Sequence, residues 1–418
     1  MTLPDTDVLT SIVSRVFRVD EVTLGDPKQG YFMRYRGQLL RDSVEAYDQL
    51  AEAMRPYDIT PMFRIEDERQ AILLIQGMPK PKPGRVWVNI LLFALTLLSV
   101  LYVGFSYSMT GPLPNDPGEA LRTVLLNLWR GWPFAVSLLG ILLAHEFGHY
   151  FAGRARGAAV TLPYFIPFPF FPIGTMGAFI QMKSLPKNKR ALFDLAIAGP
   201  LAGLVVAIPV LILGLSLSPV ETTKVATFTK TANTQDICPN NAQVGQTYTC
   251  QGLNFLEGNS ILYLGMKYLI KGELLPSPPH YTISPVLYWI RYFFTGTPLP
   301  IGGQDVMLHP VAMAGWVGLL VTFMNLIPAG QLDGGHVLFT VFGKRASRIL
   351  PIILVVLVLL GFLYTGWWLW AFLIFLLGRS HAEPLDQITQ LDSSRKGLAV
   401  LLLIVFLLVL TPIPFMVY

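Results

Sequence analysis

Long apolar runs with few or no charges occupy most of the chain after residue 85. Five of them are residues 86–108, 131–144 (which continue into a polar motif), 191–217, 310–330 and 397–417. A membrane span takes about 20 apolar residues, so each run can cross a bilayer. The pattern therefore predicts a mainly α-helical protein, a polytopic bundle of transmembrane helices.

A sixth apolar run, residues 349–378, leaves the number of spans open. As one straight helix it would be about 45 Å long, against a hydrocarbon core of about 30 Å. It is either one tilted span or a tight hairpin broken between Gly361 and Gly366. We therefore predict six or seven spans, and the side on which the chain ends depends on this choice.

The first 79 residues follow a different pattern, in which strand-like and helical periods alternate. Three segments are typical of strands and one of a helix: residues 31–36, 59–63 and 71–75, and residues 42–55. We predict a small α/β module over residues 1–79 with a regulatory or docking role. A Pro- and Lys-containing linker, residues 80–85, joins it to a membrane domain over residues 86–417.

Composition supports the same division. The chain is 53% hydrophobic and 14% charged, whereas an ordinary soluble domain has about 25% charged residues. Of its 57 charged residues, 25 lie in residues 1–85 and 32 are spread over the other 333. This excludes a single soluble globular protein. The net charge of +5 comes without a basic run interleaved with aromatic residues, so we expect no nucleic-acid partner.

Basic residues next to the predicted spans set an orientation. They are Lys80, Lys82, Arg85, Arg154, Arg156, Lys183, Lys187, Lys189, Arg190, Lys344, Arg345 and Arg348. The positive-inside rule places them, and the N-terminal module, in the cytoplasm. The first residues are unlike a secretory or transit peptide, which favours a multi-pass protein of a prokaryotic plasma membrane. Asp194 lies one helical turn after Arg190, and we expect the two to form an ion pair.

Residues 218–309 then form an extracytoplasmic loop, which could either gate or cap a site. It contains Cys238 and Cys250, the only cysteines of the chain, with turn-forming residues between them. Outside the cytoplasm we predict a disulfide between them, with two free thiols as the alternative. Residues 259–270 and 283–294 are apolar or amphipathic enough for interfacial helices.

Residues 160–182 combine four prolines with many aromatic residues. The prolines forbid a helix, yet the segment is too apolar for an ordinary loop. Non-helical backbone at membrane depth has to be buried in protein or line an aqueous cavity. We predict a membrane-embedded re-entrant β/loop segment whose edge could pair with an unwound substrate. An interfacial aromatic belt is the alternative.

A short polar motif ends the second apolar run and reads His145-Glu146-Phe147-Gly148-His149. In a helix, His145 and His149 lie on one face, where two imidazoles can bind one Zn²⁺. Glu146 is then placed to accept a proton from an attacking water. A structural pair of histidines is the alternative, but three ionisable groups at the end of an uncharged helix are costly and indicate function.

Zinc needs a third protein ligand beyond these two histidines. The candidates are acidic residues and four further histidines, His280, His309, His336 and His381. We favour Asp333, because the 310–330 run that precedes it returns to the same predicted side as the motif. Gly334 and Gly335 would let the backbone approach the metal closely.

These residues resemble a known family. The motif at 145–149, together with Asn325-Leu326-Ile327-Pro328 and Leu332-Asp333-Gly334, is similar to the site-2 proteases, zinc metalloproteases that cut within membranes. Gly199-Pro200-Leu201-Ala202-Gly203 looks like that family's Gly-Pro element. Residues 174–178, 258–260 and 314–316 resemble the subgroup of chloroplast EGY proteins and their bacterial relatives. The likeness covers roughly residues 85–417 and, to a lesser degree, the N-terminal module.

The resemblance implies that His145, His149 and Asp333 bind one zinc ion, that Glu146 is the catalytic base and that Asn325 positions or polarises the substrate. It implies single-pass membrane proteins as substrates, cut in or near their helices within the lipid bilayer. A catalytically silent scaffold or chaperone and an ion-coupled transporter are the alternatives. The intact site residues argue against the first, and the lack of an evident inverted repeat argues against the second. The oligomeric state stays open.

Overall fold

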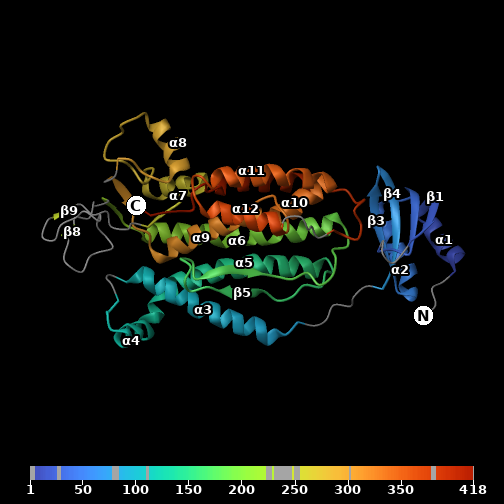
Figure 1. Cartoon of the computed structure of the whole chain (residues 1–418), viewed down its shortest axis with the longest axis horizontal. Helices are drawn as coiled ribbons and strands as arrows, with labels where there is room; N and C mark the ends of the chain where they lie inside the picture. The colour runs from blue at the N-terminus through green and yellow to red at the C-terminus, as the bar shows by residue number, and fades with distance from the viewer. Residues whose placement is uncertain are drawn as a thin grey trace.

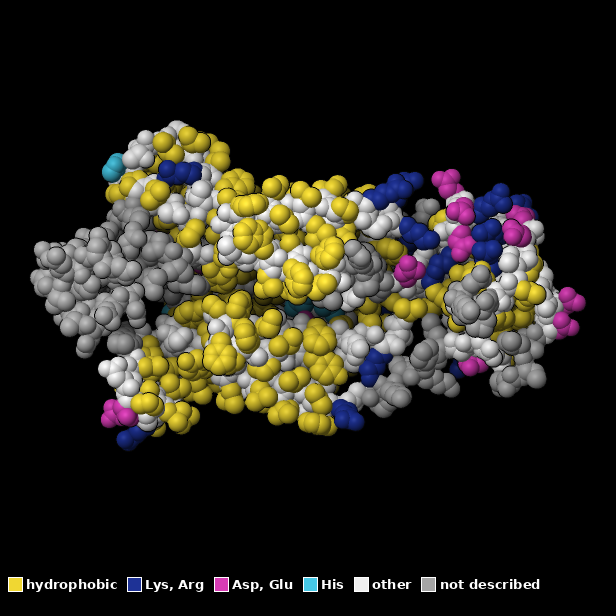
Figure 2. Space-filling model, viewed as in Figure 1, with side chains coloured by type: hydrophobic (Ala, Val, Ile, Leu, Met, Phe, Trp, Pro, Cys, Tyr) yellow, Lys and Arg dark blue, Asp and Glu magenta, His cyan; other side chains and the backbone are white. Residues whose placement is uncertain are grey.

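The computed structural model describes residues 5–25, 30–77, 84–109, 113–222, 228–229, 247–248, 255–300, 303–377 and 383–417. Figure 1 shows a bundle of helices that run along the long axis, with a small sheet domain at one end. Apolar side chains cover the bundle, whereas the sheet domain carries many charged side chains (Figure 2). The protein is mainly helical, as the hydrophobic pattern predicts.

The sheet domain contains two helices and four antiparallel strands. Its elements are α1 (Thr6–Ser14), β1 (Phe17–Leu24), β2 (Met33–Leu39), α2 (Ser43–Met54), a 3₁₀ turn (Arg55–Tyr57), β3 (Ile59–Glu66) and β4 (Arg69–Gln76). The strand order is β1-β2-β4-β3. Leu9 of α1, Leu50 of α2 and Phe63 of β3 share one buried core. The helix and three strands expected here are present, and the pattern missed α1 and β1.

Three helices in the described part of the chain are long and apolar enough to cross a membrane. They are α3 (Val86–Ser108), α6 (Lys189–Leu217) and a stretch in which α4 (Pro117–Asn127) and a 3₁₀ turn (Leu128–Gly131) lead into α5 (Trp132–Ala155). The helices α9 (Pro310–Leu326) and α13 (Ser393–Val409) have 17 residues each. The total of six or seven spans stays a prediction.

The sixth apolar run forms two short helices, α11 (Leu350–Leu360) and α12 (Gly366–Leu377), which lie against each other (Figure 1). A Cβ atom at Gly361 would lie 1.9 Å from the Trp368 ring, so the turn closes only with glycine there. The run is therefore a helical hairpin and not one tilted span.

The proline-rich segment forms a β-hairpin, β5 (Tyr164–Pro167) and β6 (Thr175–Phe179), paired antiparallel. It packs along α3: the Asn89 amide donates to the carbonyls of Leu162 and Pro163, and the Ser99 hydroxyl donates to the Gly174 carbonyl. The expected short sheet is thus present beside the bundle. Its depth in a membrane stays a prediction.

The loop between α6 and α9 is partly structured. It contains two short pairings, β7 (Val220–Thr222) with β11 (Gln304–Val306) and β8 (Phe228–Thr229) with β9 (Thr247–Tyr248). A third strand of the loop, β10 (Phe255–Glu257), pairs with β12 (Phe415–Val417), which follows α13. The two helices expected here are present as α7 (Ile261–Lys271) and α8 (Pro285–Thr295). Cys238 and Cys250 lie outside the described residues, so the disulfide stays a prediction.

Residues 385–387 form one of the contacts between the sheet domain and the bundle. On one side they bond to Phe63 at the β3 edge, through Phe63 N–H to Leu385 O (2.9 Å) and Gln387 N–H to Phe63 O (3.1 Å). On the other side the N–H groups of Leu385 and Asp386 donate to Pro186 O and Lys187 O, just before α6 begins. One extended segment therefore bridges β3 and the start of α6.

The expected ion pair of Asp194 with Arg190 was wrong. Asp194 instead receives two bonds of 2.7 Å from the guanidinium of Arg395, in α13, and it also pairs with Arg156. Arg190 donates to the Gln390 carbonyl. A bidentate guanidinium fork is stronger than an exposed pair one turn apart on a helix, and it ties α6 to α13.

Candidate metal centre

The two histidines of the motif lie together in α5, separated by one turn. Both are buried, with 4% and 5% of their surfaces exposed, and their Nε2 atoms are 3.2 Å apart. Residues four apart on a helix share one face, which is why the 145–149 spacing brings the rings together. In Figure 2, histidine atoms are visible in the seam between the lower and upper helices of the bundle.

The third group comes from a distant part of the chain. Asp333 is the first residue of α10 (Asp333–Phe342), which follows the turn after α9. Its Oδ2 atom lies 3.4 Å from His145 Nε2 and 3.3 Å from His149 Nε2. The structure therefore brings together the three residues that the sequence singled out.

The spacing of these three atoms fits zinc. A tetrahedral zinc ion lies about 2.0–2.1 Å from nitrogen or oxygen ligands, which places two such ligands roughly 3.3–3.4 Å apart. The three observed separations are 3.2, 3.3 and 3.4 Å. Within the described residues, His145, His149 and Asp333 are the one cluster of His, Cys, Asp or Glu side chains close enough to hold a metal ion.

The protonation of His149 fits the same ligand set. Its Nδ1 atom lies 2.8 Å from the Leu195 carbonyl of α6. A carbonyl only accepts, so Nδ1 carries the proton and Nε2 presents its lone pair toward Asp333 and His145 in the neutral ring. Metal-binding histidines usually donate their other N–H group in this way, which fixes the tautomer and the ring orientation.

Glu146 lies within this cluster and is 5% exposed. Its Oε2 atom has no hydrogen-bond partner in the part of the chain that the structure describes. A buried polar atom without a partner is costly, so its retention calls for a function. A carboxylate oxygen in this position is available to a water molecule.

Asn325 is also at the site. It lies in the last turn of α9, and its amide Nδ2 atom is 3.3 Å from His145 Nε2. An amide so close to the ligand atoms can donate to a carbonyl oxygen bound there. The structure thus places all five predicted residues in one cluster, from α5, α9 and α10.

Of the other histidines weighed as ligands, none described joins this cluster. His309 caps α9 by accepting from the Val311 N–H group, and His280 is an exposed loop residue. His336 is buried in the second turn of α10. His381 lies outside the described residues.

Two glycines of α6 allow the histidine face to pack closely. A Cβ atom at Gly199 would lie 2.1 Å from His149 Nε2, and one at Gly203 would lie 3.3 Å from His145 Nδ1. Glycine at these positions therefore lets α6 approach the imidazoles. This steric role, like that of the Leu195 carbonyl, cannot be seen from the spacing of polar residues.

Residues 133–364 match the sequence family described as Peptidase family M50. The chain belongs to this family. It is 29% identical over 358 residues to "Probable zinc metalloprotease EGY1, chloroplastic" of Oryza sativa subsp. japonica, covering 82% of this chain and 53% of that protein. It is 26% identical over 404 residues to "Probable zinc metalloprotease EGY2, chloroplastic" of Oryza sativa subsp. indica, covering 94% of this chain and 64% of that protein.

The expected relationship to site-2 proteases, and to their EGY subgroup, is confirmed by this membership. The matched range of the M50 chain contains every residue of the cluster, from His145 to Asp333. The chain spans only 53–64% of the length of these two relatives, so their names describe longer proteins.

Proposed function

We propose that this M50 protein is an intramembrane zinc metalloendopeptidase that hydrolyses peptide bonds within or near the transmembrane helices of membrane proteins. One observation carries the proposal: three ligand atoms from α5 and α10 lie 3.2–3.4 Å apart beside a buried glutamate. Two of these three ligand atoms belong to the His-Glu-x-x-His motif. In zinc metalloproteases the two histidines of this motif bind the metal and its glutamate is the general base.

His145, His149 and Asp333 would hold the ion through the three atoms described above. A bound zinc ion supplies Lewis acidity, which polarises the scissile carbonyl and lowers the pKa of water. The Leu195 carbonyl keeps His149 in the tautomer that presents Nε2. These contacts orient the histidines before any substrate binds.

Glu146 acts as general base and then as general acid. Its carboxylate takes a proton from the attacking water, and the carboxylic acid gives that proton to the nitrogen of the leaving amine. The amide of Asn325 donates to the oxygen of the scissile carbonyl as negative charge develops on it. Burial of Glu146 keeps bulk water away from these transfers.

The β5–β6 hairpin is the proposed guide for the substrate. An unwound substrate segment would add to its edge as a further strand, so that the scissile bond is extended. Met176 and Phe179 of β6 are 65% and 49% exposed and lie on this hairpin. Ala178→Pro is expected to reduce cleavage at least tenfold while the zinc content stays at one per chain; Ala178→Val is the control. Cleavage unaffected by the proline would refute strand addition.

We further propose the domain limits stated above: a cytoplasmic module over residues 1–79, a linker over 80–85 and a protease domain over 86–417. Six or seven spans, the re-entrant segment at 160–182 and the extracytoplasmic loop at 218–309 belong to the same proposal. The basic residues at the module end of the bundle support a cytoplasmic active site (Figure 2). We place the protein in a prokaryotic plasma membrane, whereas the names of the relatives say chloroplastic.

The test is cleavage of a single-pass membrane protein by the purified full chain. Wild-type protein should cleave, and cleavage should stop with Glu146→Gln or with a zinc chelator and return when zinc is added. Glu146→Gln should keep its zinc, which separates loss of the base from loss of the metal. Cleavage that survives both the substitution and the chelator would eliminate the proposal.

A further inference from the structure

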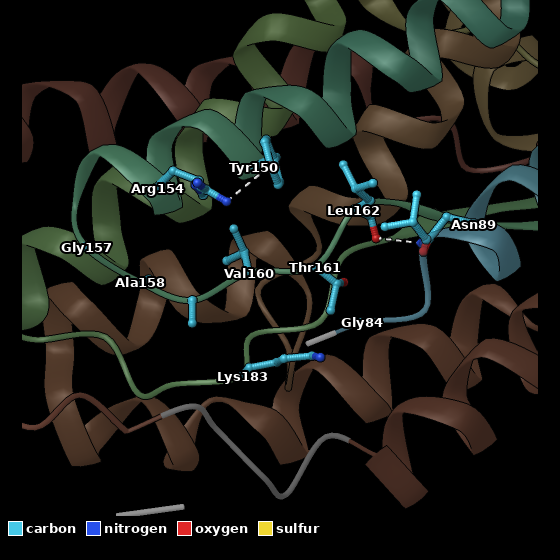
Figure 3. A pocket seen from close by; sticks show the side chains of 12 residues that line it. Gly84, Asn89, Tyr150, Arg154, Gly157, Ala158, Val160, Thr161, Leu162 and Lys183 are labelled. Carbon is cyan, nitrogen blue, oxygen red and sulfur yellow. Dashed lines mark hydrogen bonds between the residues drawn. The ribbon is translucent and has the colours of Figure 1, made fainter. Parts of the chain in front are cut away.

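An open pocket lies between the start of α3 and the last turns of α5, beginning at Tyr150, the residue after His149. Its volume is about 630 Å³, and Figure 3 shows it bordered by the start of α3, the last turns of α5 and the loop that follows. It is lined in part by Gly84 and Val86 at the start of α3 and by Tyr150 and Arg154 of α5. None of these residues belongs to the metal cluster.

The pocket carries positive charge. Arg154 and Lys183 line it, and the described lining residues include no Asp or Glu. The guanidinium of Arg154 is oriented by the Tyr150 hydroxyl, at 3.2 Å (Figure 3). The helix α3 starts at Val86 without a side-chain cap, so the positive end of its dipole adds to the two cations. The chemistry of the pocket therefore suits an anion.

The walls of the pocket are fixed by hydrogen bonds. The loop at 159–161 pairs with residues 181–183, through Lys183 N–H to Ala159 O (2.7 Å) and Thr161 N–H to Gln181 O (3.1 Å). Buried Asn89 ties the same loop to α3 through the Leu162 carbonyl, at 3.0 Å (Figure 3). The pocket is thus bounded by paired backbone on one side and by two helix ends on the other.

The position of the pocket identifies the source of the anion. It lies where two candidate membrane helices end, α3 at Val86 and α5 at Ala155. Apolar side chains next to it face outward: Trp87 is 61%, Ile90 64% and Phe151 64% exposed. Basic pockets between membrane helices on the cytoplasmic side bind lipid head groups, and exposed apolar helix surface accommodates the acyl chains.

We propose that this pocket binds the phosphate group of an anionic membrane phospholipid, held by Arg154 and Lys183, with the acyl chains along the outer surfaces of α3 and α5. The occupant is a lipid and not a soluble phosphate, because apolar surface continues directly from the charged pocket. A bound lipid would join α3 to the strand-like segment at 159–161, which leads into the β5–β6 hairpin.

Native mass spectrometry of the detergent-solubilised full chain tests this. Phosphatidylglycerol is titrated against wild type, Arg154→Gln/Lys183→Gln and, as charge-matched control, Lys344→Gln/Arg348→Gln, whose residues are exposed outside the pocket. Each basic residue near an anionic lipid contributes about fivefold to affinity, so the pocket double variant should bind about 30-fold more weakly. The control should stay within about twofold, and so should binding of phosphatidylcholine to all three proteins.

The test includes two further measurements, one on a charge-conserving variant and one with inorganic phosphate as competitor. Arg154→Lys/Lys183→Arg keeps both charges and should retain binding within about threefold. Inorganic phosphate at millimolar concentration should not displace the lipid. The proposal is overturned if the pocket variant binds like wild type, if the control loses as much affinity, or if inorganic phosphate displaces the lipid. Should the double variant not fold, the two single glutamine variants, each expected to lose about fivefold, carry the same comparison.

Discussion

His149 is the most tightly constrained side chain of the site. The Leu195 carbonyl holds its Nδ1 atom, Asp333 lies 3.3 Å from its Nε2 atom, and the backbone of Gly199 lies against the ring. Three elements, α5, α6 and α10, therefore fix one imidazole. Ligand geometry at this site depends on backbone atoms of α6 as much as on the side chains themselves.

Gly199→Ala is expected to damage the site although alanine favours helices. The added methyl group would meet His149 Nε2 at 2.1 Å, so either the ring or α6 has to move. We expect zinc affinity and cleavage to fall at least tenfold, the range seen when residues that orient a metal ligand are changed. Zinc content by mass spectrometry and a cleavage assay measure this.

Gly140→Ala is the matched control. Gly140 also lies in a candidate span, α5, and a Cβ atom there would meet nothing within 4 Å. Alanine at this position should leave zinc content and cleavage at the wild-type level. Equal losses in the two variants would show that backbone flexibility, and not the contact with His149, decides the outcome.

At the scale of elements, the region between α6 and α9 has a buried polar cluster of its own. Glu257 of β10 accepts from the Tyr263 hydroxyl (2.9 Å) and from the Lys267 ammonium (3.3 Å), both in α7. Asp305 of β11 is buried beside them. Burial raises the pKa of Asp305 to about 6; Glu257 adds to this rise, and Lys267 opposes it. The cluster joins three elements across one buried site.

Stability of this region should therefore depend on pH with a defined sign. The folded chain binds the Asp305 proton below about pH 6, whereas the unfolded chain releases it near pH 4. The folded state thus binds more protons in this window, and stability falls as the pH rises from 4 to 6. Between pH 4 and pH 6, the free energy of unfolding of the wild type should fall by roughly 3 kcal/mol relative to that of Asp305→Asn. Unfolding of both proteins at pH 4 and pH 7 checks this; parallel pH curves would contradict it.

The elements could be predicted from the sequence where their pattern is local. Residues 86–108 coincide with α3 because an apolar run of that length has few other folds. Strand β1 was missed because a register shift between Val19 and Glu21 breaks the alternation that marks a strand. The hairpin at 349–378 stayed undecided because its turn depends on the contact of Gly361 with Trp368, which no periodicity reveals.

The candidate site was predictable for a different reason. His145, Glu146 and His149 form a local motif. The positive-inside rule places Asp333, an acidic residue, on the same predicted side of the membrane as this motif. The partner of Asp194 was not predictable, because Arg395 is 201 residues away and only packing of α13 on α6 brings it close. Local spacing finds ligands, whereas pairs between distant elements require the fold.

On the scale of the whole molecule, Arg64 holds the sheet domain to the bundle. Its guanidinium is buried and donates to the carbonyls of Pro384 (3.0 Å) and Leu385 (2.9 Å). Arg64→Met should loosen this contact, because the Pro384 and Leu385 carbonyls each lose the bond that the guanidinium donates. Hydrogen exchange at the Phe63 and Gln387 amides, which bond across this contact, should then become at least tenfold faster.

Arg18→Met is the control for this change. Arg18 lies on β1, the opposite edge of the same sheet, and its pair with Asp20 is exposed. Exchange at the Phe63 and Gln387 amides should stay at the wild-type rate in that variant. If Arg64→Met also leaves exchange unchanged, the domain is held by contacts other than this guanidinium.

The bridge formed by residues 385–387 also sets an order of events during synthesis. The sheet domain can close its own core once β4 has left the ribosome, but the β3 edge gains its partner only when Gln387 has been made. At 5–20 residues per second this takes roughly 15–60 s, during which every helix from α3 to α12 is made. The nascent chain therefore carries an unpaired strand edge throughout membrane insertion. Docking of the domain becomes a late step of biogenesis, completed only after the metal ligands have been translated.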